Sequence, residues 1–108
     1  RWIVREREAE RDRVVVLAVE NAMPDPSSPP ALEDFERRVS RCAAQALVLL
    51  SRGGEIGFQA RGVKVAAHGG RPQRARILEA LARLEPISLE GAPAFPALRR
   101  GDMRRLVT

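Results

Sequence analysis

The sequence RVVVLAVENAMPDP, residues Arg13–Pro26, contains an unbroken apolar run followed by an abrupt polar end. The run, Val14–Val19, is short and rich in β-branched residues, which is typical of a central strand covered on both faces. Glu20 and Asn21 follow it, and open α/β sheets bind ligands beyond the carboxyl ends of their strands. This stretch therefore predicts a central β-strand with candidate binding residues at its C-terminal end.

The length and composition indicate one small domain. At 108 residues, of which 44% are hydrophobic, the chain is long enough for one globular core. No apolar run approaches the roughly 20 residues that span a bilayer, and no signal peptide is visible. The chain starts within a strand-like pattern at Arg1 and ends within another at Thr108. We therefore expect a single partial domain, residues 1–108, from a longer protein.

Charge and cysteine content limit the classes of partner. The net charge is +5, and arginine supplies almost all of the positive charge because Lys64 is the single lysine. Basic and acidic residues are interleaved, as in Arg5–Glu8, which does not build the one-signed face that tracks phosphates. Cys42 is the single cysteine, so the chain cannot form an internal disulfide or a cysteine metal cage. We expect a reducing, cytoplasmic setting.

The pattern of Ala31–Arg52 predicts the longest helix. Apolar residues recur at steps of three and four, and we expect the last turns, Ala46–Leu50, to lie deep in the core. Pro30 suits the first turn of a helix, and Gly53-Gly54 suits a left-handed stop. The apolar stripe consists of Leu32, Phe35, Val39, Cys42, Ala46 and Leu49.

Shorter patterns fill the rest of the chain. Arg61-Gly62 between two strand patterns predicts a tight hairpin. The order of strand, helix, hairpin and helix predicts an α/β fold with a mixed sheet and helices on both faces, which is a three-layer α/β/α sandwich. The expected elements are an edge strand at Arg1–Glu8, hairpin strands at Glu55–Ala60 and Val63–Ala67, a loop at His68–Arg71, a helix from Pro72 to Glu85, an irregular segment at Pro86–Pro96 and a strand at Arg104–Thr108.

Two segments of the chain resemble a bacterial protein family. VREREAERDRVVVLAVEN (Val4–Asn21) followed by LEDFERRVSRCAAQALVLLSRGGEIGFQARG (Leu32–Gly62) is similar to the core of the family called domain of unknown function 58. The resemblance extends from about Val4 to Leu84. It implies a truncated von Willebrand factor A-like, Rossmann-like sandwich. It also implies a membrane-anchored parent protein, from which this part is a soluble piece, and an accessory role beside a MoxR-type AAA ATPase.

The same resemblance bears on metal binding. Von Willebrand A domains often bind a divalent metal through Asp-x-Ser-x-Ser after the first strand, where one carboxylate and two hydroxyl groups meet Mg²⁺. The corresponding positions here are Glu20, Ala22 and Pro24, so both hydroxyl groups are missing and the carboxylate is one methylene longer. We therefore expect no metal site of this type and no cofactor.

The candidate partner-binding residues belong to the expected C-terminal edge of the sheet. They are Glu20, Asn21, Asp25, His68 and Arg71. A structural interpretation stands beside this one: Asn21 and Asp25 would cap turns, and His68 would be an ordinary loop histidine, because no nucleophile can be paired with it by spacing.

Three classes of function remain open. The preferred hypothesis is a non-enzymatic interaction or scaffold module that acts with a MoxR-type ATPase. The alternatives are a metal-assisted hydrolase that uses Glu20, Asp25 and His68, and an arginine-rich nucleic-acid-binding domain, which the mixed charges disfavour. Strand edges left unpaired are expected to allow pairing between chains. Cys42 lies on the apolar stripe and is expected to be buried and unreactive.

Overall fold

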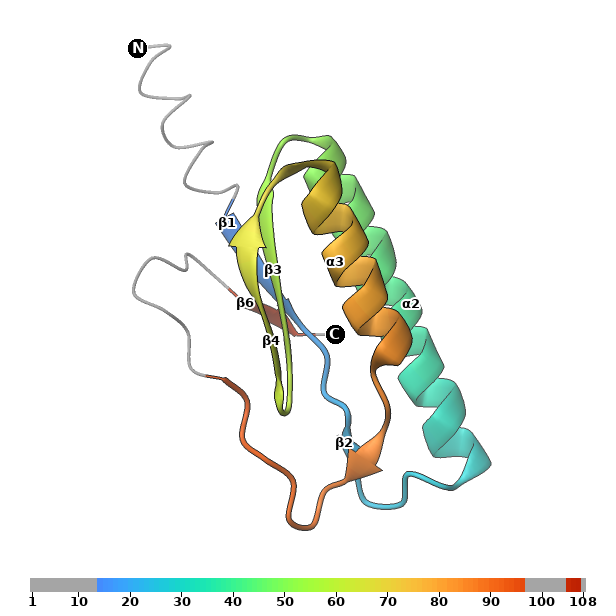
Figure 1. The fold of residues 1–108 in the computed structure, drawn as a ribbon. Coiled ribbons are helices and arrows are strands. Elements are labelled where there is room, and N and C mark those ends of the chain that lie inside the picture. The colour runs from blue at the N-terminus through green and yellow to red at the C-terminus, as the bar shows by residue number, and fades with distance from the viewer. Residues whose placement is uncertain (1–13, 97–104, 108) are drawn as a thin grey trace.

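The computed structural model describes residues 14–96 and 105–107, so the edge strand expected at Arg1–Glu8 lies outside the described residues. Within those ranges the chain has mixed α/β architecture (Figure 1). In chain order the elements are β1 (Val14–Ala18), β2 (Ala22–Met23), α2 (Pro29–Ser51), β3 (Glu55–Ala60), β4 (Val63–His68), α3 (Gly70–Arg83), β5 (Ile87–Ser88) and β6 (Arg105–Val107).

The main sheet has the strand order β4-β3-β1-β6. β1 pairs in parallel with β3, where Val14 lies opposite Glu55, and in parallel with β6 on its other side. β4 is antiparallel to β3. The predictions of a central strand at Val14–Val19, of a mixed sheet and of a strand within Arg104–Thr108 are therefore confirmed. Pairing between chains at free strand edges stays a prediction.

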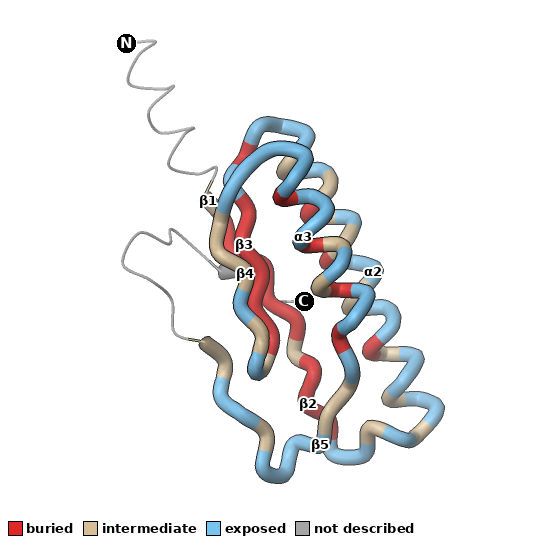
Figure 2. The backbone as a smooth tube through the Cα atoms, in the orientation of Figure 1, coloured by how far each residue is buried: buried red, intermediate tan, exposed pale blue. Residues whose placement is uncertain are grey.

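Both described helices lie on the same face of the main sheet and pack against each other (Figures 1 and 2). The expectation that these two helices cover opposite faces is therefore wrong, and the described residues form two layers. The parallel pair β1 and β3 requires a crossover, which α2 supplies. Crossovers between parallel strands of one sheet are right-handed, so crossovers that run in opposite directions along the sheet lie on opposite faces. This rule does not apply to α3, because α3 follows the antiparallel strand β4.

Alternate residues of β1, continued by Val19 directly after it, build the core between the sheet and the helices. Val15, Leu17 and Val19 are fully buried and belong to one apolar cluster. Val16 and Ala18 point to the other face and are buried too, which agrees with a strand that is apolar on both sides (red in Figure 2). The cluster is completed by Phe35, Cys42 and Ala46 of α2, Ile56, Phe58 and Ala60 of β3, Ile77 and Leu81 of α3, and Met23 and Leu84.

The C-terminal half of α2 is less buried than its composition predicts. Ala46 is buried, but Val48 is 47% exposed. The leucines Leu47, Leu49 and Leu50 are half-buried. The expectation that these turns lie deep in the core is therefore wrong beyond Ala46, because only one face of a surface helix can contact the layer beneath it.

The ends of α2 follow the local sequence. Ser28 is the N-cap residue, and its hydroxyl oxygen accepts a hydrogen bond from the Ala31 N–H at 3.3 Å. Pro29 occupies the first helical position, one residue earlier than expected. After the last turn, Gly53 has φ of +82° and its N–H donates to the Leu50 carbonyl at 3.0 Å. The predicted left-handed stop is confirmed.

The β3–β4 hairpin turns at Arg61-Gly62, as predicted, with Gly62 at φ of +77°. The pairing of the two strands shifts register at Gly57, between its two neighbours. A Cβ atom at Gly57 would lie 3.0 Å from the Val65 carbonyl oxygen, so only glycine allows β4 to approach this closely.

Gln73 of α3 bonds to both hairpin strands at this irregularity. Its side chain is fully buried, and its Nε2 donates to the Ile56 carbonyl at 2.7 Å and to the Ala66 carbonyl at 2.8 Å. A register shift disrupts the regular ladder and leaves backbone groups in need of partners. One side-chain amide therefore satisfies two backbone oxygens and ties α3 to the sheet.

A second, two-stranded sheet extends the chain beyond the end of β1. β2 and β5 pair in parallel, with Ala22 opposite Ile87. The segment Pro86–Pro96 was expected to be irregular, so this pair is a finding of the structure. A strand of two residues has no periodicity that a sequence pattern can detect.

Replacing Gln73 with methionine keeps a similar volume but removes both donors. We expect the free energy of unfolding to fall by about 2–4 kcal/mol, because each buried carbonyl that loses its donor costs about 1–3 kcal/mol. Urea denaturation followed by circular dichroism measures the change. Arg74→Met, one position along on the exposed side of α3, is the control. Equal losses in the two variants would contradict the assigned role of Gln73.

Candidate functional site

At the carboxyl end of β1, Glu20 forms an ion pair with Arg61 from the β3–β4 turn. Arg61 Nε lies 2.8 Å from Glu20 Oε1, and Arg61 Nη2 lies 3.0 Å from Oε2. The Glu20 side chain is 28% exposed and the Arg61 side chain is 23% exposed. The guanidinium group therefore bonds to both carboxylate oxygens in the two-point geometry that gives the stronger arginine–carboxylate pairs.

Further hydrogen bonds fix Glu20 in place. The Ala22 N–H donates to Glu20 Oε1 at 2.9 Å, and Arg38 Nη1 of α2 donates to the Glu20 carbonyl oxygen at 2.9 Å. The bonds from the Arg61 guanidinium hold the pKa of the Glu20 carboxyl below its ordinary value of 4.5, although partial burial acts in the opposite direction. Glu20 is therefore ionised at neutral pH.

Asn21 joins three segments that are far apart in the sequence. Its side-chain Oδ1 accepts from the Arg61 N–H at 2.9 Å, and its carbonyl oxygen accepts from the Ile87 N–H at 2.8 Å. Its Nδ2 lies 3.5 Å from the Glu85 carbonyl oxygen. The residue is only 2% exposed. Asn21 therefore has a structural role, because a buried amide must find partners. This role differs from the expected capping of a turn, since its side chain bonds to segments 40 and 64 positions away.

Arg61 continues outward beyond its ion pair. Its Nη1 donates to the Pro93 carbonyl at 3.2 Å, and its guanidinium carbon lies 5.1 Å from the centre of the Phe95 ring. Sequence analysis missed this residue as a site component. Arg61 directly follows a predicted strand, but the parallel pairing of that strand with β1, which brings Arg61 to Glu20, is not contained in a local pattern.

The contacts of Glu20 within the protein indicate a structural role for this residue. Neither Ala22 nor Pro24 carries a side-chain oxygen, and both Glu20 oxygens already accept hydrogen bonds. In the part of the chain that the structure describes, no three histidine, cysteine or acidic side chains are grouped closely enough to hold a metal ion. A shallow groove of about 340 Å³ beside Asn21 and Arg61 continues to Ile87 and Arg83.

Asp25 makes its bonds within its own turn. Its Oδ1 accepts from the Ser27 N–H at 3.3 Å and from the Ser27 hydroxyl at 2.9 Å. Its carbonyl oxygen accepts from the Ser28 N–H at 3.2 Å. The turn-capping interpretation of this exposed aspartate is therefore confirmed.

His68 and Arg71 lie at the opposite end of the sheet from Glu20. His68 is the last residue of β4 and pairs with Ile56, near the start of β3, because β4 runs antiparallel. Arg71 belongs to the first turn of α3. The expectation that His68–Arg71 forms a loop at the C-terminal edge of the sheet is therefore wrong, because His68 and Arg71 flank the N-terminal end of β1. The hydrolase set of Glu20, Asp25 and His68 is not assembled.

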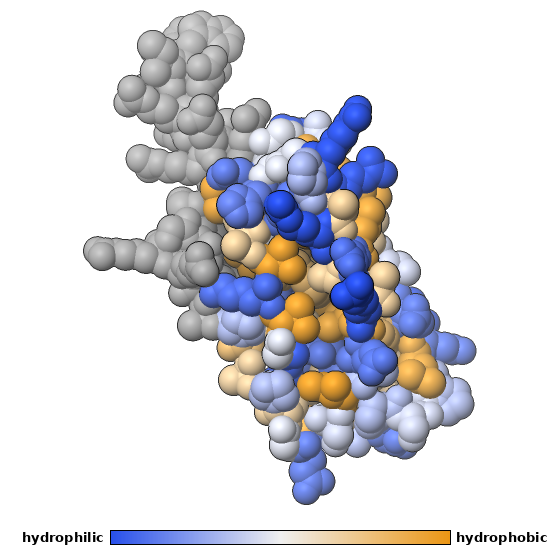
Figure 3. Space-filling view, in the orientation of Figure 1, coloured by the Kyte–Doolittle hydropathy of each residue, from blue (hydrophilic) through white to orange (hydrophobic). Residues whose placement is uncertain are grey.

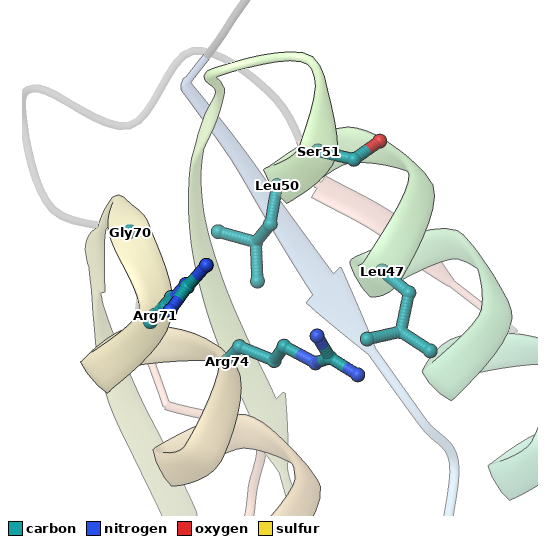
Figure 4. A pocket seen from close by; sticks show the side chains of 6 residues that line it. All are labelled: Leu47, Leu50, Ser51, Gly70, Arg71 and Arg74. Atoms are coloured by element: carbon teal, nitrogen blue, oxygen red, sulfur yellow. The ribbon is translucent and has the colours of Figure 1, made fainter.

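A different concave surface surrounds Arg71. It lies between the end of α2 and the start of α3 and has a volume of about 340 Å³ (Figure 4). Arg71 and Arg74 reach toward it from α3, and Leu47 and Leu50 reach toward it from α2, as the sticks in Figure 4 show. We call this surface, lined by Leu47, Leu50, Ser51, Gly70, Arg71 and Arg74, the interhelical groove.

Comparison with known proteins adds no relative from which residue roles could be transferred. No family model matches the chain, and neither the curated proteins nor the solved structures include a match. The resemblance to the domain of unknown function 58 family therefore stays a prediction from the sequence. Among the described residues, no helix is long and apolar enough to cross a membrane.

Replacing Glu20 with glutamine should lower stability at neutral pH, because the ion pair with Arg61 is lost. The pKa of Glu20 is lower in the folded state, so its contribution is complete above pH 4.5 and disappears as the pH falls through the folded-state pKa. The difference in urea midpoint between wild type and Glu20→Gln should therefore shrink on acidification from pH 6 toward pH 3. A pH-independent difference would contradict the ion-pair assignment.

Cys42 should be unreactive in the folded protein. Its thiol is fully buried, and this burial raises its pKa to about 12, so the nucleophilic thiolate is not populated at neutral pH. We expect Ellman's reagent at pH 8 to react only at the rate of unfolding, and to react fully in concentrated urea. Rapid reaction under native conditions would mean that the packing of α2 on the sheet is wrong.

Proposed function

We propose that this chain is a non-enzymatic protein-interaction module with a von Willebrand factor A-like fold, which acts with a MoxR-type AAA ATPase. One observation carries the proposal. At the sheet edge where such domains often hold a metal, Glu20 is bonded by Arg61 on both oxygens, and Ala22 and Pro24 stand where hydroxyl ligands would be needed. In this proposal Glu20 stabilises the fold at this edge of the sheet, and the outer surface of the domain binds the partner.

The topology supports the same proposal. A parallel strand β1 between β3 and β6, with α2 as the crossover, is the local arrangement of Rossmann-like sheets. A three-layer sandwich also needs helices on the second face of the sheet, and we propose that other parts of a longer protein supply them. In this proposal the module is cytoplasmic and its parent is anchored in the inner membrane.

The charge distribution gives less support to the nucleic-acid alternative. Residues 14–96 carry nearly equal numbers of basic and acidic side chains. Several of the arginines are committed to ion pairs, such as Arg38 with Asp34 at 2.7 Å and Arg83 with Glu79 at 2.8 Å. A phosphate-binding face needs several basic side chains on one surface that are not paired with acidic ones.

The partner is tested by titrating the immobilised chain with the MoxR-type ATPase that we propose is encoded beside its gene. We expect saturable binding in biolayer interferometry with a dissociation constant on the order of micromolar, typical of a transient regulatory contact. An unrelated AAA ATPase is the control and should not bind. If neither this chain nor the longer protein binds the neighbouring ATPase, the proposed partner is wrong.

A thermal-shift measurement separates the module from the hydrolase alternative. A bound ion stabilises the folded state by mass action, so Mg²⁺, Mn²⁺ or Zn²⁺ at millimolar concentration would raise the unfolding temperature of a metal protein. We expect no rise for this chain. A rise that Glu20→Gln abolishes would argue for metal chemistry at the carboxyl end of β1.

A further inference from the structure

The start of α3, beside the end of α2, carries unpaired positive charge. From Cys42 to Ser51, α2 has no charged residue, and α3 has no acidic residue before Glu79. Arg71 and Arg74 are exposed, and neither forms an ion pair within the described part of the chain. In Figure 3 hydrophilic side chains gather over this end, and apolar surface continues along α2.

These two arginines lie beside the apolar part of the interhelical groove. Leu47 and Leu50 are half-buried, and their side chains point from α2 toward α3 in Figure 4. The Arg74 side chain extends across the groove toward Leu47, and that of Arg71 points toward Leu50. Leu50 packs on the core, whereas Leu47 does not belong to the apolar residues that pack against it. Leu47 is therefore a half-buried apolar side chain outside the main core, and a partner's side chain could cover its exposed part.

We infer that the interhelical groove binds a short acidic peptide segment that carries an aspartate or glutamate next to a leucine-like side chain. The carboxylate would accept hydrogen bonds from Arg71 and Arg74, and the apolar side chain would cover Leu47. This inference deepens the proposed function, on which it rests in treating the chain as an interaction module, by naming the surface and the chemistry of the partner segment.

Charge and shape together favour a peptide over other anionic partners. A single-stranded nucleic acid binds by stacking its bases on aromatic rings, whereas the described residues that line the groove include two leucines and no aromatic side chain. An anionic membrane attracts clusters of about four to eight basic residues on a protruding surface, whereas two arginines flank a concave surface here. A volume of about 340 Å³ lies at the lower end of the range of ligand pockets, which suits one or two side chains of a peptide.

The direct test uses a fluorescein-labelled octapeptide that alternates aspartate and leucine, titrated with the full 108-residue chain and followed by fluorescence anisotropy. Two matched octapeptides have asparagine in place of aspartate, or serine in place of leucine. We expect saturable binding of the first peptide and affinity at least about tenfold weaker for each of the others, since both the charge and the apolar contact contribute. Equal binding of all three peptides would overturn the inference.

Pairs of matched variants test whether the peptide binds at the interhelical groove. Arg71→Gln combined with Arg74→Gln should weaken binding about tenfold. Arg37→Gln combined with Arg41→Gln removes the same charge from the first half of α2, outside the groove, and should have little effect. Leu47→Ser should weaken binding, and Val48→Ser, on the neighbouring exposed face, should not. Circular dichroism verifies that each variant is folded. Equal effects of the paired variants would mean that binding is non-specific and that the groove is not the site.

The same variants separate this inference from the proposed partner. If the neighbouring ATPase binds wild type and the Arg71→Gln, Arg74→Gln variant equally well, the groove is not its docking surface while the module proposal stands. If the ATPase does not bind but the octapeptide binds at the groove, the inference stands and the named partner is wrong.

Discussion

The parallel pairing of β1 with β3 is the constraint on which the rest of this structure depends. Two parallel strands cannot be joined by a short turn, so the chain between them must cross over the sheet. In this protein α2, residues Pro29–Ser51, makes that crossing and brings Phe35, Cys42 and Ala46 down onto the sheet. The position of α2 then fixes where α3 can pack, because α3 starts beside its end and shares the same face of the sheet (Figure 1).

Parallel pairing also explains the polar cluster at the carboxyl end of β1. Because β1 and β3 run in the same direction, Glu20 and Arg61 leave the sheet at the same edge. This edge is the usual ligand-binding position of open α/β sheets. Here Arg61 supplies the positive charge beside the Glu20 carboxylate, and Asn21 ties the start of β5 to the same point. Side chains of the protein itself, Arg61 and Asn21, therefore fill the position at this edge where other α/β proteins bind a ligand.

The two ends of the domain consequently differ in what they leave available. At the end near Glu20, this carboxylate and Arg61 are paired with each other and bonded to backbone atoms. At the other end, the first two turns of α3 expose Arg71 and Arg74 beside the apolar end of α2, without ion pairs in the described residues. This difference supports an interaction module whose recognition surface lies on the helices and away from the ligand-binding edge typical of the fold class.

Local patterns in the sequence were sufficient for β1, α2, the hairpin and the strand at the C-terminal end, because apolar periodicity and the glycines at turns are encoded over a few neighbouring residues. They were also sufficient for the missing hydroxyl ligands at Ala22 and Pro24, which are read directly from residue types. Tertiary structure alone decided that both helices share one face, that His68 lies far from Glu20, and that Arg61 meets Glu20 across forty-one positions of the chain. These features depend on strand direction and on contacts between distant segments, and a local pattern contains no record of either.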